Sequence, residues 1–151
     1  MANSSAICTS FKVDVLNGIH AFGTTVTRAG TGADTFKAAL YLTSASIGAG
    51  TTAYSATGEV TGTNYSAGGI SVTNATAPTS SGTTAFWTPS ASLVYSTVTL
   101  STAFDTVLIY NSTQSNKSVL AFNFGSTTVT AGNLTLTMPS NAAGTALINL
   151  A

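Results

Sequence analysis

The first pattern along the chain is helical and lies near its start. Large apolar side chains recur there at spacings of four, four and three residues, at Phe11, Val15, Ile19 and Phe22. This is the period of one face of an α-helix, and it predicts a helix over residues 10–22 that Gly23 ends. Gly18 weakens a helix in isolation. We therefore expect the apolar face to be stabilised by packing, either on the chain's own sheet or on another subunit.

The pattern changes to a period of two over residues 35–43, TFKAALYLT, which predicts a β-strand. A long segment, residues 44–69, follows with many glycines and no sustained period, and it predicts a loop. From Ile70 onward, short candidate strands alternate with turn signals: ISVTNAT, TTAFWTP, SLVYSTVTL, AFDTVLIYN, KSVLAFNFG, STTVT, NLTLTMP and ALINLA. Ala131–Asn133 lies between two alternating runs and predicts a hairpin turn.

These elements predict an all-β, mainly antiparallel fold, a β-sandwich or jelly roll with one short N-terminal helix. We expect residues 1–23 to form an N-terminal arm and helix, and residues 24–151 to form a single β-sandwich domain with the long loop 44–69. Trp87 fits either the core or a contact surface. A length of 151 residues is enough for one domain with its own core.

Charge changes this picture, because only 5% of the residues are charged, with four Lys or Arg and four Asp or Glu. An ordinary soluble domain has about 25%. So little charge leaves little repulsion between copies, which favours a protein packed against neighbours. The scattered cations make no basic stripe for nucleic acid, and no apolar run is long enough for a membrane span. The first residues lack the pattern of a secretory signal, so we expect synthesis in a cytoplasm.

Candidate chemistry is sparse. His20 is the single histidine, and the carboxylates Asp14, Asp34, Glu59 and Asp105 lie far apart in the sequence. No metal-binding, phosphate-binding or nucleophile motif occurs, so we expect no enzyme activity, no catalytic residue, no metal and no cofactor. His20 is interpreted as structural or solvent-facing. Cys8, the single cysteine, is interpreted as an inert thiol or, at a symmetry axis, as a cross-chain disulfide.

Five segments together resemble a family of small tailed-phage virion proteins: FKxxxLxGxHxF from Phe11, DTFKxALYxxSA from Asp34, TTAYxxxxEVxGxxYxAGG from Thr51, LIYN from Leu108 and KxVxxFxFG from Lys117. The resemblance implies a structural protein of the virion. The implied roles are a capsid decoration, or cement, protein on the outside of the major capsid lattice, or a tail- or fibre-associated protein with a receptor- or glycan-binding β-sandwich.

The decoration role predicts a location on the capsid surface, the major capsid protein as partner, and a homotrimer, with a dimer as second choice. It also explains the loop 44–69, which we expect to reach across a subunit boundary and to be uncharged because it is buried there. Apolar and tyrosine side chains of the two segments are the candidate interface residues: Phe11, Val15, Ile19, Phe22, Tyr41, Tyr54 and Tyr65.

Overall fold

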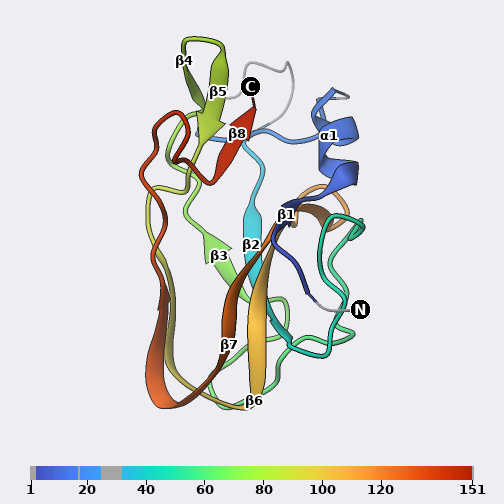
Figure 1. The fold of residues 1–151 in the computed structure, drawn as a ribbon, viewed down its shortest axis with the longest axis vertical. Helices are drawn as coiled ribbons and strands as arrows, with labels where there is room; N and C mark the ends of the chain where they lie inside the picture. The colour runs from blue at the N-terminus through green and yellow to red at the C-terminus, as the bar shows by residue number, and fades with distance from the viewer. Residues whose placement is uncertain (1–2, 17, 25–31, 151) are drawn as a thin grey trace.

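The structure is a computed structural model that describes residues 3–16, 18–24 and 32–150 (Figure 1). Its elements in chain order are β1 (Ala6–Ile7), α1 (Thr9–Leu16), β2 (Phe36–Leu42), β3 (Ile70–Val72), β4 (Thr79–Ser81), β5 (Thr84–Trp87), β6 (Leu93–Asn111), β7 (Lys117–Leu136) and β8 (Ile148–Leu150). Every strand pairing is antiparallel. The prediction of a nearly all-β, antiparallel fold with one short helix is therefore confirmed.

The strands form two sheets, one of five strands in the order β1-β7-β6-β2-β3 and one of three in the order β4-β5-β8. A long hairpin of β6 and β7, closed by a turn at residues 112–116, makes most of the larger sheet. The two strands run together down one side of the molecule, bend at its lower end and continue up the other side (Figure 1). Several shifts of register between Tyr95 and Thr106 accompany this bend.

The sequence divided this hairpin into five short strands, and the structure corrects that division. The predicted turn at Ala131–Asn133 is a bulge inside β7, where Gly132 lies opposite Val98. Ala131 has a φ of 47°, and Thr97 on the facing strand has a φ of 52°. The side-chain oxygen of Asn133 accepts a hydrogen bond from the Thr97 amide at 2.8 Å. The turn-forming residues therefore increase the twist of a strand pair that continues past them, which is the usual effect of a bulge.

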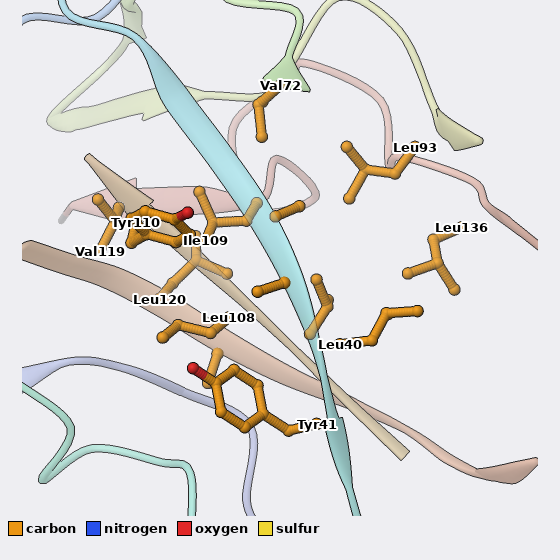
Figure 2. Close-up of a cluster of buried hydrophobic side chains, with 14 of the residues drawn as sticks. Leu40, Tyr41, Val72, Leu93, Leu108, Ile109, Tyr110, Val119, Leu120 and Leu136 are labelled. Atoms are coloured by element: carbon orange, nitrogen blue, oxygen red, sulfur yellow. The ribbon is translucent and has the colours of Figure 1, made fainter. Parts of the chain in front are cut away.

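β2 is the central strand of the core, between β6 and β3. Its residues from Ala38 to Tyr41 are fully buried, although they alternate between the two faces of the strand. In the view of Figure 2, Leu93 and Leu136 lie on one side of β2 and Val119 and Leu120 on the other. β2 therefore lies inside the molecule, among core side chains from both halves of the bent hairpin.

The helix is shorter than predicted: α1 ends at Leu16, before Ile19 and Phe22. Gly18 has a φ of +66°, its amide donates to the Val15 carbonyl, and the Ile19 amide donates to the Asp14 carbonyl. This pair of bonds is a Schellman motif, in which a left-handed glycine terminates the helix. The helix packs on its own sheet, since Phe11 belongs to the core cluster. No helix in the described part of the chain is long and apolar enough to cross a membrane.

Candidate interface and its polar supports

An apolar groove lies between α1, the segment after it, and the strands β5 and β8. Its volume is about 120 Å³, and its lining is almost entirely aliphatic and aromatic: Phe11, Val15, His20, Phe22, Pro78, Ala85, Phe86, Trp87, Ile148 and Leu150. Val15 and Leu150 are 37% and 41% exposed. Among the described residues these are two of the three exposed large hydrophobic side chains, which makes the groove the candidate interface of the molecule.

The floor of the groove is an aromatic cluster that belongs to the core. Phe22 stacks on Phe36, with ring centroids 4.6 Å apart and an interplanar angle of 10°, and its ring centroid is also 4.6 Å from that of Trp87. Trp87 is only 2% exposed, and its indole nitrogen donates to the Thr76 carbonyl at 2.8 Å. Of the two roles open for Trp87, the structure therefore gives it the core.

A buried polar network holds the segment after α1 against the sheet. The Ala21 amide donates to Asp34 at 2.8 Å, and the Asn111 side-chain amide donates to the same carboxylate oxygen at 2.9 Å. At the other end, Lys117 Nζ lies 3.0 Å from Asp14 Oδ1. His20 lies between the two carboxylates, within 3.0 Å of Asn111 Nδ2. These contacts fix an irregular segment that has no backbone ladder of its own.

The network also sets the protonation of His20. Asn111 Oδ1 accepts hydrogen bonds from the backbone amides of Thr113 and Gln114, so Asn111 Nδ2 must be the group that donates to His20 Nδ1. The imidazole proton then resides on Nε2, which faces Asp14 Oδ2 at 3.7 Å. Burial lowers the pKa of His20, and the neighbouring Asp14 carboxylate opposes this only in part. His20 is therefore a buried, neutral, structural residue.

A second polar centre surrounds Glu59, in the middle of the long loop. Glu59 is buried, and its carboxylate accepts hydrogen bonds from the hydroxyls of Tyr54 and Tyr65, each at 2.7 Å, and from the Gly68 amide at 2.8 Å. Tyr110 donates in turn to the Gly68 carbonyl at 2.8 Å. Charge-assisted bonds of this kind are among the stronger ones in proteins. They tie both ends of the segment 54–68 to one carboxylate.

All five tyrosines of the chain lie in or beside this centre. Tyr41 donates to the Ser55 carbonyl at 2.6 Å, and Tyr95 donates to the Ala38 carbonyl at 2.8 Å. The rings of Tyr54 and Tyr110 stack at 4.7 Å, and those of Tyr65 and Tyr95 at 6.0 Å. Burial, reinforced by the Glu59 charge, raises the pKa of Tyr54 to about 12. The same causes raise the pKa values of the other four.

The loop 44–69 therefore folds back on its own sheet. Leu42 N donates to the Gly58 carbonyl and Val60 N to the Leu40 carbonyl, so the loop adds a rung beside the end of β2. Gly69 passes so close to β2 that a Cβ atom there would overlap the Ala38 carbonyl oxygen. The loop is held to its own sheet at these points, while other residues, such as 61–64, are exposed, so its expected reach to a neighbouring subunit stays a prediction.

The candidate interface residues accordingly divide into two groups. Val15 and Phe22 line the groove, together with the buried Phe11, whereas Ile19 is half-buried and outside the lining. Tyr41 is fully buried, which corrects it to an internal role. Tyr54 and Tyr65 are half-buried with their hydroxyls directed into the chain, and their place in an interface stays a prediction. The sequence missed the contribution of β5 and β8 to the groove, because these strands lie more than sixty residues from α1.

Most of the remaining reactive groups are buried. Cys8 is a free, fully buried cysteine, and burial raises the pKa of its thiol. Of its two interpretations, this position fits the inert thiol. Asp14, Asp34 and Glu59 are also buried, so within the described residues Asp105 is the one carboxylate with substantial exposure. No group of three or more His, Cys, Asp or Glu in that part of the chain is placed to hold a metal ion.

Comparison of the chain with protein-family models, with curated proteins and with solved structures found no significant match.

Proposed function

We propose that this protein is a non-enzymatic structural component of a tailed-phage virion, a decoration protein on the outside of the capsid. The observation that carries the proposal is where its few charges lie. Three of its four carboxylates are buried, in two networks that hold the arm and the loop to the sheet. The outer surface thus keeps almost no acidic charge, and such a surface is suited to close packing against neighbours.

The fold supports the same role through stiffness. In this proposal the two sheets act as the layers of a β-sandwich, and the bent β6–β7 hairpin links them. Long segments without regular structure are held by side-chain hydrogen bonds to the sheets, as at Glu59 and Asp34. A body of this kind can cover a lattice without ordering new chain on binding, which lowers the entropic cost of each contact.

A decoration protein acts by mass action. It binds the assembled, expanded shell and does not bind the free capsid subunit, so each bound copy stabilises the shell by RT ln(1 + [L]/Kd). Even at a ligand concentration of 100 Kd this amounts to about 2.7 kcal/mol for one site. Stabilisation of a whole head therefore depends on occupancy of many equivalent sites, and no bond is made or broken.

The test is the copy number and position of the protein in purified particles. Quantitative mass spectrometry against the major capsid protein should give a stoichiometry set by the head lattice, and a density map should place this fold on the head exterior. A few copies at the tail would instead support the tail- or fibre-associated role. Absence of the protein from purified particles would reject both virion roles.

A further inference from the structure

β8 is the outer strand of the three-stranded sheet, and its outward edge has no strand partner among the described residues. Soluble monomers usually protect such an edge with charged side chains, proline or a bulge. Ile148–Leu150 has none of these features, and the sequence carries no charged residue from position 118 to its end. In Figure 1 β8 and α1 lie at the same end of the molecule. Residues of both elements line the groove.

The side chains of β8 follow an apolar, polar, apolar order. Ile148 and Leu150 both line the groove, so they share one face of the strand. Asn149 lies on the other face, where its side chain accepts a hydrogen bond from Gly144 N and donates to the Ala146 carbonyl. The strand therefore has the same pattern when read in either direction from Asn149.

We propose that a second copy of this chain occupies the groove, by antiparallel pairing of β8 with β8 about a two-fold axis at Asn149. In that register Ile148 lies opposite Leu150 of the second copy, on the same face of the sheet. Each Leu150 then enters the groove of the other copy. The two three-stranded sheets become one of six strands, in the order β4-β5-β8-β8-β5-β4.

Two observations favour a second copy over a foreign strand. A two-fold interface requires a patch that is complementary to itself, and the order of side chains around Asn149 meets this requirement. The groove is also of suitable size: an apolar cavity of about 150 Å³ accepts benzene, and this one, of about 120 Å³, suits a single aliphatic side chain. The pairing predicts a dimer, which was the second of the two oligomeric states expected from the sequence.

The first test is sedimentation of the purified protein over a range of concentrations. The unmodified chain should sediment as a dimer. Leu150→Lys should raise the dimer dissociation constant at least about 100-fold, because the symmetric interface loses two buried leucines. Val94→Lys is the matched control: Val94 is 43% exposed, on β6, and does not line the groove. Val15→Lys, on the opposite rim, serves as a second groove variant if Leu150→Lys fails to fold.

The second test asks whether the strands themselves pair. Amide hydrogen exchange over residues 147–150 should slow at least about tenfold between dilute, monomeric protein and the dimer, because outward-facing amides of β8 gain partners. A monomer at all concentrations, a trimer, equal loss of association in the Val94 variant, or a dimer with unchanged exchange at β8 would each overturn the proposal. Self-association is measured without capsids, so its failure leaves the copy-number test of the virion role unaffected.

Discussion

Raising the pH should unfold this protein cooperatively, because its tyrosines are held in the neutral form. Tyr41, Tyr65, Tyr95 and Tyr110 are buried or nearly so, with pKa values raised by burial and by the Glu59 charge. In the unfolded chain the same groups ionise near pH 10. Above that pH the folded state binds more protons than the unfolded state, so the free energy of unfolding falls as pH rises.

The size of the effect follows from the number of groups. A tyrosine that stays neutral in the fold while it ionises in the unfolded chain costs about 1.4 kcal/mol per pH unit well above pH 10. Three such groups, Tyr41, Tyr65 and Tyr95, remove about 4 kcal/mol by pH 11 and about 8 kcal/mol by pH 12. A domain with a typical stability of about 5–15 kcal/mol should therefore unfold between about pH 11 and pH 13.5.

The assay is a paired titration of tyrosinate absorbance near 295 nm and of far-ultraviolet circular dichroism. We expect the main absorbance change to coincide with the loss of strand signal, in one steep transition. Glu59→Gln should reduce stability at pH 7 by about 2–4 kcal/mol, through the loss of charge-assisted bonds, and so shift the transition to lower pH. Gradual ionisation of four or five tyrosines near pH 10 with an intact fold would refute this reasoning.

Three further perturbations test other parts of the fold. Gly69→Ala should lower the free energy of unfolding by more than about 2 kcal/mol, because the residue has a φ of 72° and its Cβ would overlap the Ala38 carbonyl. The control Gly50→Ala, with open space around it, should change it by less than about 0.5 kcal/mol in the same chemical denaturation. Thr97→Asn should raise the melting temperature, because a β-branched residue is strained at a φ of 52° and the conformational cost is about 1 kcal/mol lower for Asn. The control Ser96→Asn should have no effect. The pKa of His20 is lowered below 6.5 in the folded state, so the unfolded chain binds the extra proton first as the pH falls. The free energy of unfolding should therefore decrease below about pH 6.5, by at most about 1.4 kcal/mol per pH unit. His20→Asn should remove this slope in urea titrations at pH 5–7.5.

The periodic parts of the fold could be predicted from sequence because their signals are local. β2 was predicted within a residue at either end, since alternation and flanking polar residues mark it. The length of α1 was not, because apolar spacing continued past Gly18, whose left-handed conformation terminates the helix. The β6–β7 hairpin was divided wrongly for a related reason: Gly and Asn signal a turn and a bulge equally well, and only the pairing partner decides between them.

The Glu59 centre left a signal that the sequence analysis did not use. Between Lys37 and Asp105, Glu59 is the single charged residue. A lone carboxylate in a long uncharged loop is expensive to bury, so its presence indicates partners that satisfy it. Those partners come from the loop itself and, through Gly68 and Tyr110, from β6. Tyrosine supplies both the donors and the apolar area, which explains why this residue type gathers there.

Uncharged residues occur in two parts of this chain that differ in their surroundings. The loop 44–69 is held to its own sheet around Glu59, although many of its other residues are exposed. The groove is different, because exposed Val15 and Leu150 flank an open strand edge that the described chain leaves uncovered. A second chain can cover such exposed apolar side chains and pair with a strand edge that has no strand partner. Since α1 and β8 stand at opposite ends of the sequence, no local pattern could have indicated that surface.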